Sequence, residues 1–500
     1  MLGSRTPLIA CAIAFAMFAV GAVHAAAALA PPMDTSFGAS LSGLNPYTFE
    51  PLNRGFAVAP DGSFVIAGAR RVKWRGERGH EMDRWAIKRF KKNGSTDRRF
   101  GSRGTTLLKF RSDRSSYPHD NYAQAAAFQS DGKLLVAGSI DVATLGDFNR
   151  AQDGEDEELP YGDVTNYVMA IARFTKRGKL DKSFGNGGVR TIRTTPAHRP
   201  WGPAQDDEFV AAIQQLPNKK IVVTADHNTH AFTGGAQRGG VYRLTKNGAV
   251  DHSFGTGGAV RITGGPGKND AFQLASSAID ATGRIVLVGS IYKDDKESWG
   301  VIRVQPNGSL DKTFGDAGRA VFAAGPLADQ NAPIHLPHRA RSIAIAADGK
   351  LLVSGDLPAL GNANLSRPGA LRLTTDGAVD NTFGENGVAA ASTPSGSTSG
   401  GYSLTLTADG KIALAGLIQL PPLEREDNQD WSGIVARFTV EGARDATWGT
   451  DGLVQLAGSG VSVCGSRIQL ARQQDQLLLA GCRTKQGKKL QTAEVFRLLP

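Results

Sequence analysis

Histidine and aspartate residues are the side chains of this sequence whose types could do acid–base or metal chemistry. Seven of the eight histidines beyond residue 25 lie between the repeated segments of the chain rather than within them. Histidine acts as a general acid or base near neutral pH and is a common metal ligand. Polar connections also collect histidine by composition, and we favour that interpretation. The candidates for a catalytic or metal site are Asp226, His227, His230, His335 and His338.

Other signatures of catalysis are missing from the sequence. It contains no H-E-x-x-H, G-x-S-x-G or paired C-x-x-C motif, and its glycine-rich turns do not lead into helical patterns that could hold a phosphate. We therefore predict no cofactor and leave a metal ion open. The sequence favours a binding protein without catalytic activity, and the alternative is a hydrolase or lyase with a His/Asp site.

Charge is distributed unevenly along the chain. Residues 70–114 contain sixteen Lys or Arg and five Asp or Glu, whereas residues 141–163 contain one Arg and eight acidic residues. Opposite fields of this kind orient a charged partner on approach. We expect a protein or an anionic polysaccharide as the partner, and we do not expect nucleic acid because the chain is predicted to be secreted.

The N-terminus predicts a secretory signal peptide over residues 1–25. Arg5 precedes an apolar run from Leu8 to Val23, and small residues precede a cleavage point after Ala25. A lipoprotein signal through Cys11 is disfavoured because the apolar run follows this cysteine instead of preceding it. We expect a short linker over residues 26–32, a location in the periplasm or outside the cell, and no membrane span in the mature protein.

Two cysteines remain after removal of the signal peptide, and we predict a disulfide between them. Cys464 and Cys482 lie near the ends of two strand-like segments that a polar stretch separates, so an antiparallel hairpin could bring them together. Thiols oxidise in the compartment that the signal peptide predicts.

An internal repeat must position all of these residues. An Asp-x-Ser/Thr-Phe/Trp-Gly element, with Arg once in place of the hydroxyl residue, occurs seven times at intervals of 60 to 84 residues. A second element, a turn followed by Lys or Arg, an apolar run and Gly, as at Asp131 to Gly138, recurs with its relatives seven times as well. Each unit contains four apolar segments separated by turns of the Asp-Gly type, which favour hairpins. Seven such units predict an all-β, seven-bladed β-propeller with four-stranded blades over residues 33–500. The alternative is a β-solenoid, whose repeats are usually much shorter.

Three elements that recur together resemble the delta-60 repeat of bacterial secreted proteins. They are the Asp-Gly-Lys hairpin, the Ala-Arg-Phe end of the third strand, and the Leu-Asp-x-Ser-Phe-Gly-x-x-Gly turn, as at Leu180 to Gly188. The resemblance covers about residues 33–500. It implies a propeller-like fold and a secreted protein, and it supplies no catalytic residues.

The two ends of the chain complete one unit. The last unit stops at Pro500, before its Asp-x-Ser-Phe-Gly element, and an isolated copy of that element begins at Asp34. We predict that about residues 33–48 supply the outer strand of a seventh blade whose other strands come from about residues 461–500. This arrangement would close the ring, which we expect to be monomeric, and would pair otherwise open strand edges.

An arginine ends the third strand of every unit, and in six units it stands eight residues before the Asp of the turn. We predict structural Arg-Asp pairs, because the guanidinium forms bidentate contacts with a carboxylate. The predicted pairs are Arg89 and Asp97, Arg173 and Asp181, Arg243 and Asp251, Arg303 and Asp311, Arg372 and Asp380, Arg437 and Asp445, and Arg497 and Asp34.

Function is expected instead in the connections that differ between units, such as 70–84, 141–166 and 418–431. These connections would form the binding face. In the enzymatic alternative, the site would lie at the channel mouth on that face.

Overall fold

The structure is a computed structural model of the 500-residue chain. It describes residues 34, 36–37, 39–40, 55–73, 81–110, 121–141, 167–192, 206–229, 238–265, 267, 270–293, 296–323, 339–359, 362–393, 398–419, 431–456, 468–484 and 491–500.

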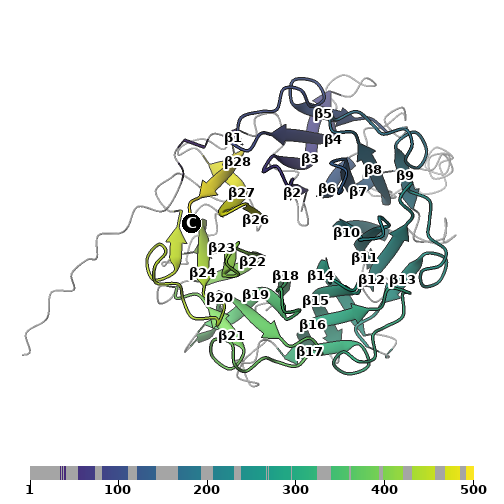
Figure 1. Ribbon diagram of the computed structural model, residues 1–500. Coiled ribbons are helices and arrows are strands. Elements are labelled where there is room, and N and C mark those ends of the chain that lie inside the picture. The colour runs from purple at the N-terminus through teal and green to yellow at the C-terminus, as the bar shows by residue number, and fades with distance from the viewer. Residues whose placement is uncertain are drawn as a thin grey trace, which may run out of the picture.

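Seven four-stranded antiparallel sheets form a ring, with the first strand of each sheet nearest the centre (Figure 1). The described residues contain no helix. This arrangement confirms the prediction of a seven-bladed propeller, and the solenoid alternative is wrong. Each blade has a hydrophobic face toward each neighbour, so the core consists of clusters between successive blades. Radial closure is what covers these faces.

The strands of the first four blades follow one another along the chain. Blade 1 contains β2 (Phe56–Val58), β3 (Phe64–Lys73), β4 (Glu81–Phe90) and β5 (Thr105–Leu108). Blade 2 contains β6 (Asn121–Phe128), β7 (Leu134–Asp141), β8 (Tyr167–Phe174) and β9 (Val189–Ile192). Blade 3 contains β10 (Asp206–Gln215), β11 (Ile221–Thr229), β12 (Arg238–Leu244) and β13 (Ala259–Ile262). Blade 4 contains β14 (Ala271–Ile279), β15 (Ile285–Lys293), β16 (Lys296–Val304) and β17 (Arg319–Ala323).

The remaining blades follow the same plan until the last strand. Blade 5 contains β18 (Ala340–Ile345), β19 (Leu351–Ala359), β20 (Asn362–Leu373) and β21 (Val388–Ala390). Blade 6 contains β22 (Thr398–Leu406), β23 (Ile412–Gln419), β24 (Trp431–Phe438) and β25 (Leu453–Gln455). Blade 7 contains β26 (Gln469–Gln473), β27 (Gln476–Thr484), β28 (Gln491–Leu498) and, as its outer strand, β1 (Ala39–Ser40).

The two ends of the chain therefore meet in one blade, as predicted. Ala39 pairs with Val495 in the sheet, and the Arg497 Nε donates to the Asp34 carboxylate at 2.9 Å. The ring of Phe37 stacks on Phe64 of blade 1 with centroids 6.0 Å apart. The N-terminal segment thus connects blade 7 to blade 1 as well as completing blade 7.

The repeated aromatic residue packs against the next blade. Phe184 of blade 2 lies beside Gly248 of blade 3, whose backbone has φ +84° and whose missing Cβ would come within 2.7 Å of the ring. Glycine is required there for both reasons. In blade 6 the residue is Trp448, and its indole N–H donates to the Leu499 carbonyl at 3.1 Å. Blade 7 offers this carbonyl where other blades offer the glycine turn, which explains the one departure from Phe.

Several predictions about the ends of the chain lie outside the described residues. These are the signal peptide over 1–25, the linker over 26–32 and Cys464. Cys482 lies in β27 opposite Ala493, so its disulfide with Cys464 stays a prediction. Among the residues that the structure describes, there is no helix that could span a membrane.

Candidate functional site

The repeated arginine and aspartate of each blade meet at a corner beside the glycine turns. In blades 2 to 6 the Arg Nε donates to the Asp Oδ2 at distances of 2.6 to 2.8 Å. Each guanidinium also lies over the aromatic ring of its own corner, at 4.5 to 4.9 Å from the centroid. Arg173 and Arg372 further donate to backbone carbonyls of the next blade, those of Lys246 and Val440. The corner therefore joins neighbouring blades.

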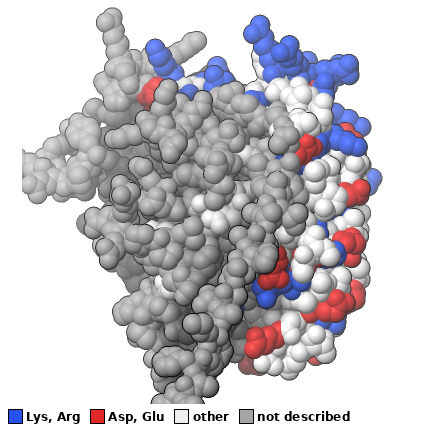
Figure 2. Space-filling model, turned by 90° about the vertical axis from the view of Figure 1, so that its left-hand side faces the viewer, with Lys and Arg blue, Asp and Glu red and all other residues white. Residues whose placement is uncertain are grey.

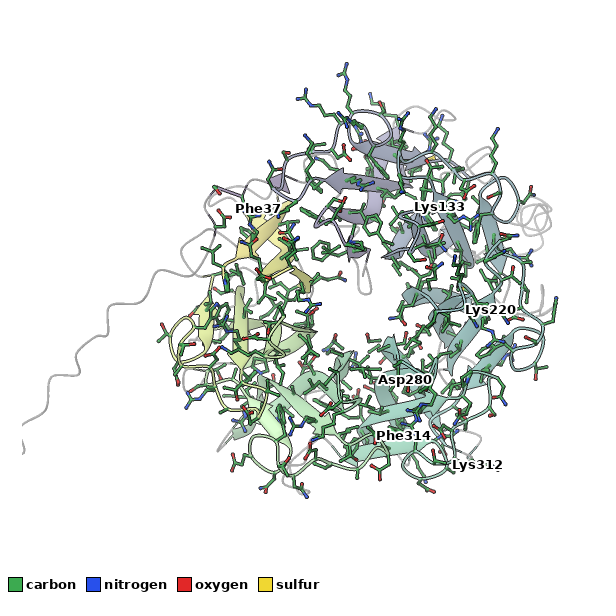
Figure 3. The ribbon with its side chains drawn as sticks, viewed as in Figure 1. Phe37, Lys133, Lys220, Asp280, Lys312 and Phe314 are labelled. Carbon is green, nitrogen blue, oxygen red and sulfur yellow. The ribbon has the colours of Figure 1, made fainter. Side chains whose placement is uncertain are left out.

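A lysine completes four of these corners, and the sequence analysis missed it. The Lys133 Nζ lies 2.8 Å from the Asp181 Oδ2, and the same contact recurs in blades 3, 5 and 6 at 2.8 to 3.0 Å. Figure 3 shows Lys133 and Lys220 at corresponding places in neighbouring blades. The signal was present, because the lysine directly follows the Asp-Gly turn in the repeat or, at Lys220, its Asn-Lys counterpart.

These partners set the ionisation of the corner carboxylates. Burial opposes ionisation of Asp181, but hydrogen bonds from Lys133 and Ser183 outweigh it and hold its pKa well below the usual range. The same balance lowers the pKa of Asp445 to about 2, with Thr447 and Lys411 as the donors. Hydrogen bonding and ion pairing thus favour the charged forms of Asp181 and Asp445, as a structural pair requires.

Blade 1 has an incomplete corner. Ser63 stands where four other blades have lysine, and the Arg89 Nε is 3.5 Å from the Asp97 Oδ2. Another nitrogen of Arg89 donates to the Ser63 hydroxyl at 3.0 Å instead. The Asp97 side chain is 20% exposed, compared with 1 to 11% in blades 2 to 6. The shorter side chain leaves open space at this corner.

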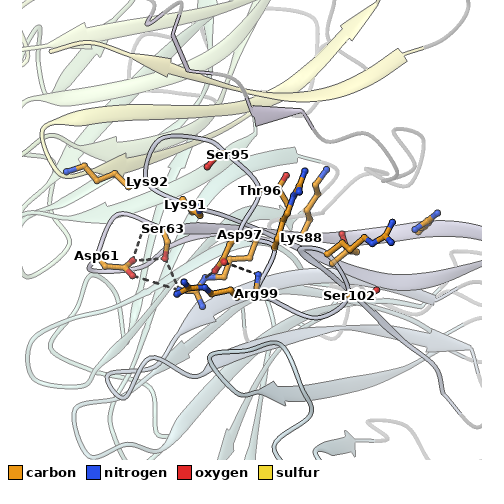
Figure 4. Close-up of a pocket in the computed structure, with 15 residues that line it drawn as sticks. Asp61, Ser63, Lys88, Lys91, Lys92, Ser95, Thr96, Asp97, Arg99 and Ser102 are labelled. Atoms are coloured by element: carbon orange, nitrogen blue, oxygen red, sulfur yellow. Dashed lines mark hydrogen bonds and ion pairs between the residues drawn. The ribbon is translucent and has the colours of Figure 1, made fainter.

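A pocket of about 1300 Å³ lies beside this corner, at the turn end of blade 1. Asp61 and Ser63 lie on one turn, and Lys91, Lys92 and Ser95 lie on another (Figure 4). Eight basic side chains line the pocket against two carboxylates, those of Asp61 and Asp97. The basic residues are Arg70, Lys88, Arg89, Lys91, Lys92, Arg98, Arg99 and Arg103.

The two carboxylates of the pocket are already engaged. The Asp61 Oδ1 accepts hydrogen bonds from the Ser63 backbone and hydroxyl at 2.8 and 2.6 Å. Asp97 accepts a hydrogen bond from the Arg99 backbone at 3.2 Å in addition to its contact with Arg89. The pocket thus presents an excess of positive charge, which is suited to binding an anion.

The structure separates the two described candidates for acid–base chemistry. Asp226 and His227 are neighbours in β11, so their side chains point to opposite faces of blade 3. Asp226 accepts a hydrogen bond from the Leu274 backbone of blade 4 at 3.2 Å. His227 meets the Tyr242 hydroxyl at 2.6 Å. The two side chains cannot act on one substrate atom.

Burial governs the ionisation of both residues. It raises the pKa of Asp226 to about 7. It lowers the pKa of His227 to about 4, with a smaller contribution from Arg261.

The other candidates, His230, His335 and His338, lie outside the described residues. Within the described part of the chain, no group of three His, Cys, Asp or Glu residues could hold a metal ion.

A second polar cluster joins blades 5 and 6, and the sequence analysis did not identify it. Arg341 contacts Asp356 at 2.9 Å and lies over the ring of Tyr402 at 4.9 Å. Asp356 also accepts the backbone N–H of Gly401 at 3.2 Å. Since each charge has a partner from the same or the next blade, this cluster connects blades.

Comparisons with known proteins agree with the fold. The family model described as "Domain of unknown function (DUF5122) beta-propeller" matches residues 216–254, 281–314 and 346–383, which fall in blades 3, 4 and 5. The comparison with curated proteins found no match.

Solved structures were matched at low sequence identity. A protein of unknown function from Dyadobacter fermentans DSM 18053 is 10% identical with a TM-score of 0.44, over 94% of this chain and 100% of the other. The polysaccharide lyase Uly1 is 9% identical with a TM-score of 0.49, over 90% of both chains. An α-L-arabinofuranosidase from Fusarium graminearum is 10% identical with a TM-score of 0.38, over 75% of this chain and 92% of the other. The seven sheets identify the chain as a β-propeller, and three of its blades match this family model.

Proposed function

We propose that this protein binds an anionic polysaccharide through the basic pocket of blade 1. The observation that carries the proposal is the lining of the pocket, with eight basic side chains against two engaged carboxylates. Arginine favours this role because its planar guanidinium forms paired hydrogen bonds with carboxylate and sulfate-like groups. The pocket lies at the turn ends of the strands, whereas the variable connections, where the sequence analysis placed binding, lie largely outside the described residues.

Blade 1 is rich in basic residues. Figure 2 shows Lys and Arg gathered near the upper edge of the molecule, with Asp and Glu more frequent below. At the corner positions equivalent to Lys92 and Ser102 of blade 1, blade 5 has Thr375 and Glu385. An acidic polymer would therefore be attracted more strongly to blade 1 than to blade 5.

A polysaccharide fits the expected location of the protein. The repeats resemble the delta-60 type, which implies a secreted bacterial protein, and the predicted signal peptide directs the chain to the periplasm or the exterior. We infer that the acidic polymers available there are polysaccharides rather than nucleic acids. The mature chain would bind as a monomer.

The test is calorimetric titration of the purified chain with polygalacturonate and with neutral dextran at several salt concentrations. We expect binding of polygalacturonate alone, weakening as salt screens the charges. The triple substitution Arg98→Ala, Arg99→Ala, Arg103→Ala should reduce the affinity at least tenfold. Lys312→Ala, at the blade 4 position that corresponds to Arg98, is the matched control and should change nothing.

Two results would contradict the proposal: equal affinity of the triple variant and the unsubstituted chain for polygalacturonate, or tighter binding of single-stranded DNA than of polygalacturonate at the same salt concentration.

The alternative function, a hydrolase or lyase, has the hydrogen bond between His227 and Tyr242 in its favour. Shortening of the polymer during the titration, lost on His227→Ala, would favour that alternative.

A further inference from the structure

Backbone hydrogen bonds join neighbouring blades at five equivalent seams, on the face of the ring that carries the glycine turns. At the first seam the Gly101 N–H of blade 1 donates to the Arg177 carbonyl of blade 2 at 2.8 Å. The equivalent bond, at 2.7 to 2.9 Å, joins each further pair of blades as far as blades 5 and 6. We define a seam by the two residues after the donating glycine, the accepting residue and the residue before it.

The charge of the seam residues changes sign around the ring. The seam of blades 1 and 2 contains three cations, that of blades 2 and 3 one, and that of blades 3 and 4 none. The seams of blades 4 and 5 and of blades 5 and 6 contain two carboxylates each and no cation. Blades 1 and 2 lie across the ring from blades 5 and 6 (Figure 1). The cations are Arg103, Lys176, Arg177 and Lys246, and the carboxylates are those of Asp316, Asp376, Glu385 and Glu441.

The seams do not need these charges. All eight residues are exposed, and none of them forms an ion pair with a residue that the structure describes. The corner lysines, by contrast, are paired, as Lys133 is with Asp181. The seam of blades 3 and 4, with Thr256 and Asn307, forms the same backbone bond without any charge. The seam cations are therefore available to a ligand.

The cations of the first two seams continue the basic pocket. Arg103 lines the pocket and also belongs to the first seam. Arg89, another lining residue, donates to the Lys176 carbonyl at 2.8 Å. At the next seam the Gly185 N–H donates to Asn247, the neighbour of Lys246. Positive seam charge thus extends from the pocket across blade 2 to the edge of blade 3.

Exposed charges of this kind favour a long ligand over a short one. Each exposed pair contributes little, because water and salt screen it. Several weak contacts made by one chain add up, whereas a small acidic sugar reaches few of them. A chain that continued beyond blade 4 would meet only carboxylates at the next two seams, so the favourable course ends at blade 3.

We propose that the basic pocket is one end of a binding track for an extended acidic polysaccharide, which passes over the seam of blades 1 and 2 and the seam of blades 2 and 3. The inference rests on the proposed function and adds to it the length and the course of the ligand. The pocket takes one part of the chain, and Lys176, Arg177 and Lys246 bind the acidic groups that follow.

The track variant Lys176→Ala, Arg177→Ala, Lys246→Ala tests this course, because it leaves the residues that line the pocket unchanged. In calorimetric titration, polygalacturonate should bind it about fivefold more weakly than the unsubstituted chain, since several weak contacts are lost. Trigalacturonate, which the pocket holds on its own, should bind both proteins equally.

The matched control removes three exposed lysines that lie at or just after the ends of β3, β5 and β15 remote from the glycine turns. It should keep both affinities, although its net charge falls by the same amount. The control substitutions are Lys73→Ala, Lys109→Ala and Lys293→Ala.

The inference is overturned if the track variant binds polygalacturonate as tightly as the unsubstituted chain, or if the control loses as much affinity as the track variant. If the track variant fails to fold, glutamine at the same three positions is judged by the same affinities. A face that instead joined two copies, basic seams against acidic seams, would give a dimer in light scattering that the track variant abolishes, and this result with unchanged polymer affinity would also overturn the inference. Unchanged polymer binding in the Arg98, Arg99 and Arg103 variant would reject the proposed function itself.

Discussion

Asp311 and Asp226 are two almost inaccessible carboxylates, at 1% and 2% exposure, whose acidities are shifted in opposite directions. Burial opposes ionisation of Asp311, yet hydrogen bonds from Thr313 and Arg303 lower its pKa to about 2. Asp226 has the same penalty and accepts one backbone hydrogen bond, from Leu274, so its pKa rises to about 7. Partners, and not burial, decide the charge state of these groups.

The difference follows from the repeat. Asp311 occupies a position at which every blade has an aspartate, and the arginine that pairs with it recurs as well. Asp226 occupies a position that is Ser139 in blade 2 and Ser290 in blade 4. Blade 5 has Asp356 there, and in that blade Arg341 accompanies it at 2.9 Å. A repeated charge comes with its counter-charge, whereas Asp226 of blade 3 has no ion-pair partner among the residues that the structure describes.

The largest expected effect comes from making Asp311 resemble Asp226. Arg303→Ala would leave a buried carboxylate without its arginine and should lower the free energy of unfolding by about 3–5 kcal/mol. The same change at the incomplete corner, Arg89→Ala, should cost about 0–1 kcal/mol, because that pair is longer and more exposed. Urea unfolding at pH 7 measures both, and equal losses would show that the corners do not differ in the way the structure indicates.

The pH dependence of stability distinguishes the contributions of Asp226 and His227 in blade 3. Between pH 3.8 and about 7 the folded protein keeps a proton on Asp226 that the unfolded chain releases, so this residue makes stability fall as pH rises. His227 acts in the opposite sense between about pH 4 and 6.5, where the unfolded chain holds the proton and the folded one does not. The two contributions oppose each other in the unsubstituted protein.

Asp226→Asn should reveal the contribution of His227. The amide oxygen can still accept the Leu274 hydrogen bond, but the group no longer titrates. The free energy of unfolding of this variant should rise between pH 4 and 6.5 by up to about 3 kcal/mol more than in the unsubstituted chain. Urea unfolding at half-unit steps checks the slope. His227→Gln is the converse variant and should show a falling slope over the same range; parallel curves for all three proteins would contradict the assignment.

The repeated features could be predicted from the sequence because each was seen several times. The Asp and Gly of the turns and the split element at Asp34 were enough to predict seven blades and the closure at β1. The opposite orientations of Asp226 and His227 could also have been predicted, since adjacent residues of a strand point to opposite faces of the sheet. The role of Ser63 could not, because a single residue that departs from a repeat gives no indication of what it contacts until the register places it beside the pocket.

The smallest predicted effect comes from exchanging the residues at positions 63 and 133, in the corners of blades 1 and 2. Ser63→Lys should place an ammonium beside Asp97, as Lys133 lies beside Asp181, and should raise the free energy of unfolding by about 0.5–1 kcal/mol, because the pair is partly exposed. Lys133→Ser should lower it by a similar amount. Ser63→Lys also tests the pocket, since a lysine at position 63 would occupy the part of the pocket beside Asp97, and polygalacturonate should bind less tightly despite the added positive charge. Tighter binding by Ser63→Lys would show that charge alone governs the site, and destabilisation by this substitution would show that the corner of blade 1 is complete without a lysine.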